Sequence, residues 1–345
     1  MSARSLLVDA QRPDPATMAE AAALLREGNV VAFPTETVYG LGADALNADA
    51  VARIYVAKGR PAWNPVIAHA PDIEAARALT RSWPESAERL AQAFWPGPLT
   101  LVLPRASHVP DIVTAGLDAV GVRVPAHPVA LALLRATGRP IAAPSANRFT
   151  QVSPTTAAHV QTSLGDRIPL ILDGGPCEVG IESTVVDLTS DTPTVLRPGM
   201  ISRRQLEAVL GRPVALSVGS VRADDASTSG QRSPGMADRH YAPHADVWLF
   251  ASTQRGEIER ALTARQRSVT SPGGPVVALL LGTTVHVGAT GRVVPMPDDP
   301  QAYARALYAE LHAADADGAS LVIIEQPPED DQWRGVHDRL VRAAR

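Results

Sequence analysis

The sequence predicts an α/β or α+β fold, in which helices flank a sheet of mixed strand directions. Short apolar runs and longer amphipathic segments are both frequent, but they do not alternate strictly as in a doubly wound parallel sheet. The chain has 345 residues, which is long for one hydrophobic core, so two domains are expected. A stretch rich in Ser, Gly, Asp and Arg, residues 211–243, is typical of a linker between them.

The region before this linker combines helices and strands with clear end signals. Gly28 stops the first helix, and Trp95 to Pro98 end the third one sharply. The expected helices are residues 16–27, 48–57, 86–94, 128–137 and 202–210. The expected strands are residues 29–33, 66–70, 99–103, 120–124, 140–143, 169–172, 183–188 and 194–196. Polar loops, such as the one from Pro34 to Thr37, connect them.

The region after the linker does alternate between the two kinds of segment, which predicts a smaller Rossmann-like α/β domain. Its expected strands are residues 246–250, 276–281 and 319–324, and its expected helices are residues 254–265, 301–314 and 335–344.

The composition excludes several classes of protein. The net charge is −4 and only 4% of the residues are aromatic, which argues against a protein that mainly coats a nucleic-acid backbone. Cys177 is the only cysteine, so a disulfide framework and a cysteine zinc site are excluded. No apolar run is long enough for a membrane span, and residues 1–11 lack the apolar segment of a signal peptide. We therefore expect a cytoplasmic protein without membrane partners.

Four cationic residues lie in apolar strand-and-turn contexts: Lys58, Arg60, Arg123 and Arg197. Lys58 is the only lysine in the chain, which either reflects chance or marks a site that needs a compact point charge. Burying such groups is costly without anionic partners, and few acidic residues lie beside them in the sequence. An anionic ligand is the simplest compensation.

Further polar residues follow the ends of expected strands, where α/β sheets bind ligands. Each has a structural alternative. Ser153 has the position of a helix N-cap, His69 could be a satisfied core histidine, and a lone arginine in a strand is often paired. The known phosphate loops and nucleophile elbow are absent, and the proline between His240 and His244 argues against a helical metal pair. No metal-ligating residues are therefore predicted.

Several dispersed segments, taken together, resemble the YrdC-like threonylcarbamoyl-AMP synthases. They are residues 33–41 (FPTETVYGL), 58–61 (KGRP), 64–65 (NP), 144–147 (PSAN) and 182–187 (ESTVVD). Residues 233–236 (SPGM) and 240–243 (HYAP) resemble the linker of the longer, two-domain members. The resemblance implies a YrdC-like twisted mixed sheet forming a concave cleft. It also implies a catalytic domain at residues 1–211, a linker crossing the cleft at residues 212–244 and a small α/β domain at residues 245–345.

The resemblance also implies a reaction, in which L-threonine, bicarbonate and ATP give threonylcarbamoyl-AMP and pyrophosphate. The product serves the threonylcarbamoyladenosine modification of tRNA next to the anticodon, through a downstream tRNA threonylcarbamoyl transferase complex. ATP would be a substrate and Mg²⁺ would bridge its phosphates. Because two anions must approach each other, cationic clamps should supply most of the catalysis. A closing linker would protect the labile intermediates.

Residue roles follow from the same resemblance. Lys58 and Arg60 would be catalytic. The ATP-binding residues would be Lys58, Arg60, Asn64, Ser145, Asn147, Ser153, Arg197, His240 and Tyr241. The threonine-binding residues would be Thr37, His69, Arg123, Ala143 and Ser183, with Arg123 holding the carboxylate through bidentate hydrogen bonds.

Two alternatives remain at the level of sequence. The chain could be an RNA-binding module that uses the basic cleft, with a weak contact to tRNA, although the acidic balance and few aromatic residues count against this. A related carbamoyl-transfer domain would need zinc-binding cysteines that the chain lacks.

Overall fold

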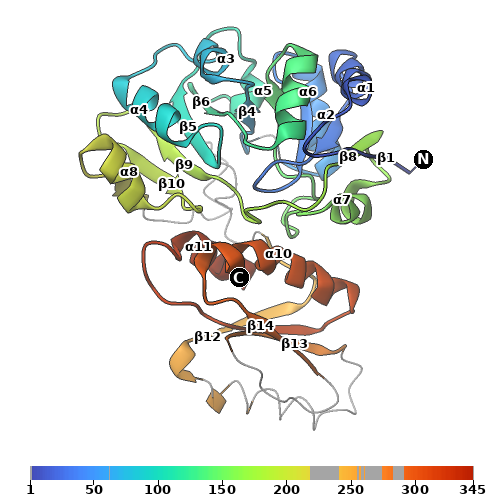
Figure 1. Ribbon diagram of the computed structural model, residues 1–345, viewed down its shortest axis with the longest axis vertical. Helices are drawn as coiled ribbons and strands as arrows, with labels where there is room; N and C mark the ends of the chain where they lie inside the picture. The colour runs from blue at the N-terminus through green and yellow to red at the C-terminus, as the bar shows by residue number, and fades with distance from the viewer. Residues whose placement is uncertain are drawn as a thin grey trace.

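The computed structural model describes residues 2–61, 63–217, 241–254, 256–257, 260, 274–282 and 291–344. Two α/β units are built on two separate sheets: a large unit, residues 2–217, and a small unit, which begins at residue 241. In Figure 1 the small unit lies below the large one, with helices α10 (Pro300–Ala316) and α11 (Arg334–Ala343) between its sheet and the large unit. Within the described residues, no helix has the length and apolarity that crossing a bilayer requires.

The large sheet is mixed, as predicted. Its described strands run in the order β1-β8-β2-β3-β7-β4-β6-β5-β9-β10-β11. The β4–β6 and β5–β9 pairs are parallel, whereas β3–β7, β4–β7 and β5–β6 are antiparallel. The strands are β1 (Arg4–Leu7), β2 (Val31–Phe33), β3 (Gly40–Asp44), β4 (Ile67–His69), β5 (Leu99–Pro104), β6 (Ala119–Arg123), β7 (Ile141–Ala142), β8 (Leu170–Asp173), β9 (Thr184–Asp187), β10 (Thr194–Arg197) and β11 (Ala215–Leu216).

The helices of the large unit bury their apolar faces against this sheet. Helices α1 and α6 share one core cluster with residues of β2 and β8, and the other helices contribute mostly to a second cluster. The helices are α1 (Pro15–Arg26), α2 (Ala48–Lys58), α3 (Ile73–Ala78), α4 (Glu85–Phe94), α5 (Asp111–Thr114), α6 (Pro128–Thr137), α7 (Ala157–Leu164) and α8 (Arg203–Leu210).

Helix α2 determines where the only lysine lies. The Asn47 side chain caps its N-terminus by accepting from the backbone N–H groups of Asp49 and Ala50. Gly59 ends it in the left-handed conformation, with φ of 63°, which glycine adopts without steric cost. Lys58 is therefore the last helical residue, rather than part of the following loop.

The small sheet is parallel throughout its described pairs. Strands β12 (Asp246–Phe250), β13 (Val276–Leu281), β14 (Gly291–Met296) and β15 (Leu321–Glu325) have the order β12-β15-β13-β14. Strand β14 was not expected from the sequence. Of the helix expected at residues 254–265, only residues 254, 256–257 and 260 are described: Gln254 ends a 3₁₀ turn (Ser252–Gln254), and residues 256, 257 and 260 are helical. The parallel arrangement confirms the prediction of a smaller α/β region.

The two units share a hydrophobic core. Side chains of α10, α11 and the small sheet form one buried cluster with Val38, Val152 and Ile181 of the large unit. Backbone contacts are also close, because a Cβ atom on Gly180 would lie 2.5 Å from the carbonyl oxygen of Ala304 in α10. The units therefore pack as one body through α10 and α11.

Candidate active site

An open pocket lies where strands of the large sheet end and Tyr241 enters from the small unit's side. The pocket is lined by Thr35, Thr37, Val38, Gly40, Arg60, Ile67, His69, Arg123, Ala143, Pro144, Ser145, Glu182, Ser183, Arg197 and Tyr241. All five residues predicted to bind threonine are among them. Of the residues predicted to bind ATP, the lining includes Arg60, Ser145, Arg197 and Tyr241.

Arg123 is fixed at the end of β6 by a buried ion pair. Its Nη2 donates to Glu36 Oε1 at 2.6 Å and to Thr37 Oγ1 at 3.0 Å, and its Nε donates to the Gly97 carbonyl at 3.2 Å. Both partners of the ion pair are at least 94% buried. The expectation that the cations lack acidic partners is therefore wrong for Arg123. Its charge is paired with Glu36, which is distant in the sequence but adjacent in the structure. None of these hydrogen bonds uses Nη1, so this nitrogen can donate to a ligand.

His69 lies at the end of β4, beside Arg123 in the register of the parallel β4–β6 pair. Its ring meets Phe33 edge-on, with 6.5 Å between the ring centroids. Burial and then the charge of Arg123 lower the pKa of His69 to about 3, so the imidazole is neutral at pH 7. Among the described residues Nδ1 has no hydrogen-bond partner, which distinguishes His69 from a satisfied core histidine.

Ser183 and Arg197 form one hydrogen-bonded unit where β9 begins and β10 ends. The Ser183 hydroxyl is 2.8 Å from the hydroxyl of Thr100. Arg197 Nη2 donates to the Ser183 hydroxyl at 3.1 Å. Arg197 also donates to the Ser183 carbonyl from Nε and Nη2. Burial lowers the pKa of Arg197, yet the guanidinium stays charged at neutral pH. Thr100 was missed because it lies inside an apolar strand.

Lys58 lies behind the pocket rather than in its lining. Its Nζ donates to the carbonyl oxygens of Ser145 and Asn147, both at 2.5 Å, and is 3.4 Å from Asn147 Oδ1. Burial and then the charge of Arg60 lower the pKa of Lys58 well below its usual value. Through these hydrogen bonds, the Lys58 amino group holds the loop that carries Ser145.

Arg60 lines the pocket and is oriented by its own loop. Its Nη2 donates to Asn64 Oδ1 at 2.6 Å and to the Pro65 carbonyl at 2.8 Å. Asn64 is thus placed to support Arg60, and its Nδ2 has no partner among the described residues. Burial lowers the pKa of Arg60 to about 10, which still leaves it charged at neutral pH.

Ser153 is not a helix N-cap. Helix α7 is capped by Thr156, whose hydroxyl accepts from the His159 N–H, whereas the Ser153 hydroxyl donates to Glu182 Oε1 at 2.5 Å. Tyr241 is 1% exposed and has a φ of 62°. Its ring stacks on Tyr308 of α10 with 5.9 Å between centroids. His240, also predicted to bind ATP, lies outside the described residues.

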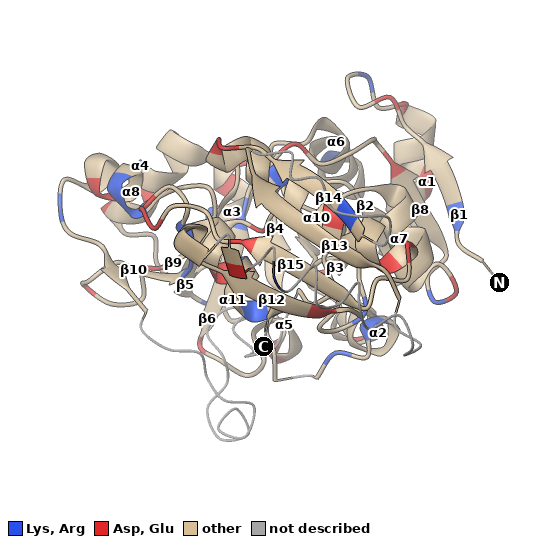
Figure 2. Cartoon of the chain, turned by 90° about the horizontal axis from the view of Figure 1, so that it is seen from below, with Lys and Arg blue, Asp and Glu red and all other residues tan. Residues whose placement is uncertain are grey.

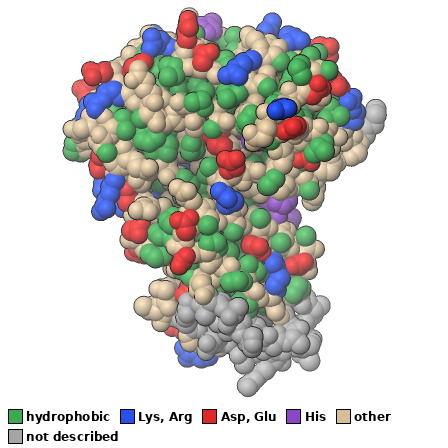
Figure 3. Space-filling model, viewed as in Figure 1, with side chains coloured by type: hydrophobic (Ala, Val, Ile, Leu, Met, Phe, Trp, Pro, Cys, Tyr) green, Lys and Arg blue, Asp and Glu red, His purple; other side chains and the backbone are tan. Residues whose placement is uncertain are grey.

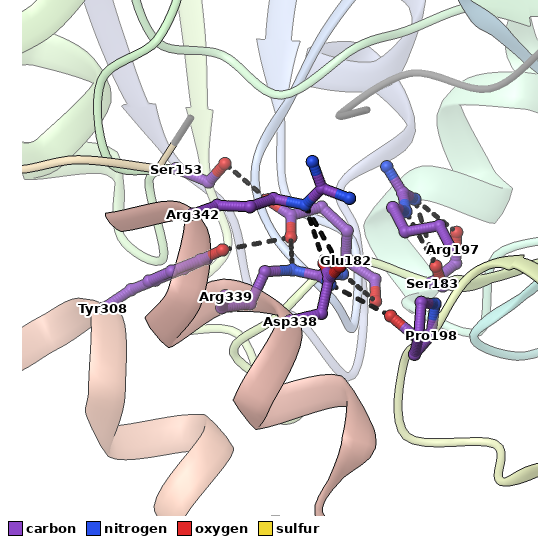
Figure 4. Close-up of polar contacts among 9 residues, drawn as sticks. All are labelled: Ser153, Glu182, Ser183, Arg197, Pro198, Tyr308, Asp338, Arg339 and Arg342. Atoms are coloured by element: carbon purple, nitrogen blue, oxygen red, sulfur yellow. Dashed lines mark hydrogen bonds and ion pairs between the residues drawn. The ribbon is translucent and has the colours of Figure 1, made fainter. Parts of the chain in front are cut away.

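Glu182 connects this pocket to the small unit and was not predicted as a functional residue. Figure 4 shows its carboxylate between Ser153, Tyr308 and Arg339. Its only signal in the sequence is its place in the segment Glu182-Ser183-Thr184.

Neither a metal site nor a reactive thiol is evident. Within the part of the chain that the structure describes, no three His, Cys, Asp or Glu side chains group as metal ligands would. The carboxylates of Glu36 and Glu182 are both engaged by arginines. Burial raises the pKa of the Cys177 thiol, which makes it unreactive.

Charges of both signs are mixed over the described surface. Basic and acidic positions are scattered among one another in Figure 2, and in Figure 3 they are interspersed on the visible face. Several exposed arginines pair with carboxylates, for example Arg77 with Glu88 and Arg81 with Asp118. This face does not present the continuous basic track that binds a nucleic-acid backbone.

Comparisons with known proteins agree with this arrangement. Residues 23–199 match a family model described as "Telomere recombination", and residues 201–345 match one described as "Threonylcarbamoyl-AMP synthase, C-terminal domain". The threonylcarbamoyl-AMP synthase of Pyrococcus abyssi is 42% identical over 328 residues, which cover 94% of this chain and 93% of that protein. The enzyme of Bacillus subtilis is 42% identical over 335 residues, covering 95% and 92%.

A solved structure extends the similarity to three dimensions. The crystal structure of P. abyssi Sua5 complexed with L-threonine aligns with a TM-score of 0.90 and 39% identity, covering 99% of this chain and 97% of that one. Similarity of this extent includes both units. The chain therefore belongs to the two-domain threonylcarbamoyl-AMP synthase family.

Proposed function

We propose that this protein is an L-threonylcarbamoyladenylate synthase, which converts L-threonine, bicarbonate and ATP into threonylcarbamoyl-AMP and pyrophosphate. The observation that carries the proposal is the pocket itself, where three guanidinium groups converge with small hydroxyl groups and a neutral histidine. Such a lining suits two anionic substrates, one of which is a small amino acid. Family membership over both units supports the same reaction.

The threonine end of the pocket is assigned to Thr37, His69, Arg123, Ala143 and Ser183. Arg123 is fixed by Glu36, so its guanidinium is already oriented to receive the threonine carboxylate. The hydroxyl of Thr37 or Ser183 can exchange a hydrogen bond with the threonine hydroxyl. His69 is neutral and has an unused ring nitrogen, so it can accept a hydrogen bond without adding charge.

The reaction forms two bonds in succession. The threonine amine attacks the carbon of bicarbonate, water leaves, and a carbamate results. A carbamate oxygen then attacks the α-phosphorus of ATP, while the bond from this phosphorus to the bridging oxygen breaks and pyrophosphate leaves. Arg60 and Arg197, which line the pocket, offset the charge of the approaching anions. A covalent enzyme intermediate is not required.

The remaining residues predicted for ATP have supporting positions. Lys58 and Asn147 shape the loop of Ser145, Asn64 orients Arg60, and Ser153 reaches Glu182. Lys58 could still reach phosphate if that loop moves when ATP binds. Mg²⁺ would accompany ATP as a substrate complex and offset the charge of its phosphates.

The wider setting follows from the proposed product. We infer that residues 212–244 act as a linker across the pocket between a catalytic domain (1–211) and a small domain (245–345), because Tyr241 already lies in the lining. We expect the product to pass, in the cytoplasm, to a tRNA threonylcarbamoyl transferase complex. Any direct contact with tRNA would be weak, because the visible surface mixes charges of both signs.

The test is a pyrophosphate-release assay in which each substrate is left out in turn, with the nucleotide product identified by mass spectrometry. We expect release that requires threonine and bicarbonate together, and a product with the mass of threonylcarbamoyl-AMP. Release without threonine, or no release at all, would exclude the synthase. RNA binding in the absence of release would instead favour the RNA-binding module.

An Arg123→Lys variant separates the two substrates in this assay. Lysine keeps the charge but lacks the planar fork, so one charge-assisted hydrogen bond to the carboxylate is lost. The KM for threonine should rise roughly tenfold or more, while the KM for ATP changes little.

A further inference from the structure

Arg339 is a fully buried guanidinium that the small unit contributes to the large one. It lies on α11, yet it is 0% exposed, and its Nε donates to Glu182 Oε2 at 2.7 Å. Tyr308 of α10 donates to the same oxygen at 3.1 Å. In Figure 4 both side chains reach upward from the helices of the small unit to the carboxylate of the large unit.

Arg339 also connects the two strand ends that carry pocket residues. Its Nη2 donates to the carbonyl of Glu182 at 3.3 Å, and its Nη1 donates to the carbonyl of Pro198 at 3.0 Å. These carbonyls belong to the residues next to Ser183 and Arg197, both of which line the pocket. One guanidinium therefore links the residue two before β9 to the residue directly after β10.

The helix that carries Arg339 is held against the same turn by a close backbone contact. A Cβ atom on Gly335 would lie 2.6 Å from the carbonyl oxygen of Gly199, so only glycine fits at this position of α11. Gly199 is itself packed against the backbone of residues 182–184. A displacement of α11 would therefore be transmitted to the turn that carries Arg197.

Tyr241 of the predicted linker is part of the same cluster. The Arg339 guanidinium lies 5.1 Å from the centre of the Tyr241 ring, and Tyr308 stacks on this ring. Ser153, which is also predicted to bind ATP, donates to the other carboxylate oxygen of Glu182. The ion pair thus contacts Tyr241 through Arg339 and Ser153 through Glu182.

Stability alone does not account for this arrangement. A buried ion pair often contributes no more to folding than well-packed apolar side chains of similar volume, whereas removing one partner is costly. Burial opposes ionisation of Glu182, but the charges of Arg339 and then Arg197 lower its pKa to about 2. Unlike apolar packing, the pair fixes the orientation of the groups around it. Arg339 makes three hydrogen bonds to two separate segments of the large unit and a fourth to Asp338.

We propose that Arg339 is a positioning residue for the synthesis reaction, which sets Ser183, Arg197 and Tyr241 through Glu182 and Pro198 without touching substrate. The small unit then completes the active site from behind, rather than only covering it. This inference rests on the proposed function of the pocket.

The experiment compares Arg339→Lys with Arg334→Met in the full-length chain, measuring thermal stability and the kinetic constants for each substrate. Lysine keeps a cation beside Glu182 but cannot also donate to both carbonyls. We expect Arg339→Lys to stay folded and to lose at least about tenfold in kcat/KM for ATP, since small misplacements of catalytic groups have effects of this size. Arg334, also on α11, is half exposed and forms its ion pair with Asp331, which is not a partner of Arg339, so Arg334→Met should keep wild-type kinetics.

Wild-type kinetics in a folded Arg339→Lys variant would overturn the proposal. If that variant does not fold, the double variant Glu182→Gln, Arg339→Met removes both charges at once and serves instead. A purely structural role predicts that the double variant regains both melting temperature and activity. The positioning role predicts that the melting temperature recovers while kcat/KM stays below that of Glu182→Gln alone, which measures what the pocket-lining carboxylate itself contributes. An inactive wild-type protein would count against the proposed function itself, not against the role of Arg339.

Discussion

At the scale of single residues, three of the four cations predicted to share a site show that they are compensated in different ways. Arg123 has a carboxylate, Glu36, at 2.6 Å. Lys58 and Arg60 are surrounded mainly by carbonyl and amide oxygens, which stabilise a charge without cancelling it. The inference from sequence to an anionic ligand is therefore best supported near Lys58 and Arg60. At Arg123, a ligand carboxylate would instead join an existing ion pair.

Replacing Lys58 tests whether its amino group is needed to hold the loop that carries Ser145 and Asn147. Lys58→Met keeps the length of the side chain but leaves the carbonyls of Ser145 and Asn147 without their donor. Because an unsatisfied buried polar group costs about 1–3 kcal/mol, we expect the free energy of unfolding to fall by about that amount. Synthesis should be lost, because Ser145 lines the pocket.

Urea denaturation, calorimetric titration with threonine and the synthesis assay together check this prediction. Threonine binding serves as the internal control. Of the residues assigned to threonine, His69 and Arg123 are held by β4, β6 and Glu36 rather than by Lys58. Full synthesis by a folded Lys58→Met variant would show that neither the loop nor the charge is needed.

At the scale of elements, local patterns were sufficient for the long helices and the apolar strands. Helices α1, α2, α4, α6 and α8 all occur within two residues of their expected bounds, because each has an apolar face with a recognisable cap or stop. Strand β3 was missed because its sequence, Gly-Leu-Gly-Ala-Asp, has low strand propensity. It forms because β2 and β7 pair with it on both sides.

The candidate site residues were predicted from the family resemblance, and most of those assigned to threonine lie at or near strand ends. The five expected threonine-binding residues line one pocket because those strands are neighbours in the sheet. Glu36, Glu182 and Arg339 were not assigned a role. Glu36 and its partner Arg123 are 87 residues apart in the sequence, and Glu182 and its partner Arg339 are 157 residues apart. Such pairings depend on how the elements pack.

Helices α7 and α10 meet through two stacked histidines, which predicts a pH-dependent contact between the units. The rings of His159 and His312 are 3.8 Å apart, and His312 Nε2 lies 3.0 Å from the Ser153 carbonyl. Burial and then the neighbouring His312 lower the pKa of His159 to about 4, and burial lowers that of His312. Between pH 6.5 and about 4 the unfolded chain binds more protons than the folded one. Stability should therefore fall as the pH falls through this window.

The measurement is the melting temperature at pH 7 and pH 5 for wild type and two variants. His159→Phe keeps an aromatic ring against His312 but cannot be protonated, so its loss of melting temperature at pH 5 should be smaller than that of the wild type. His108→Gln, at an exposed position of the large unit, should behave as the wild type does. An unchanged pH dependence in His159→Phe would show that this contact does not govern acid stability.

At the scale of the whole molecule, the small unit is joined to the large one by a shared core as well as by the Glu182–Arg339 pair. Val38, Val152 and Ile181 of the large unit are buried in the cluster that α10 and α11 form. Val38 follows the loop that holds Arg123, and Ile181 precedes Glu182. Contacts between the units are therefore next to both groups of pocket residues, so the fold couples docking of the small unit to the shape of the site.

Truncation after Ser217 tests this coupling and keeps β11 in the large sheet. We expect the truncated chain to be strongly destabilised, because it exposes the apolar core that α10 and α11 cover. The fraction that folds should still bind threonine through Arg123. It should synthesise threonylcarbamoyl-AMP at least about a hundredfold more slowly than the full chain, because Tyr241 is missing and Ser183 and Arg197 are no longer set by α11. Size-exclusion chromatography, threonine titration and the synthesis assay distinguish these outcomes. Synthesis at the full-length rate would show that the large unit is a complete enzyme and that the small unit serves another purpose.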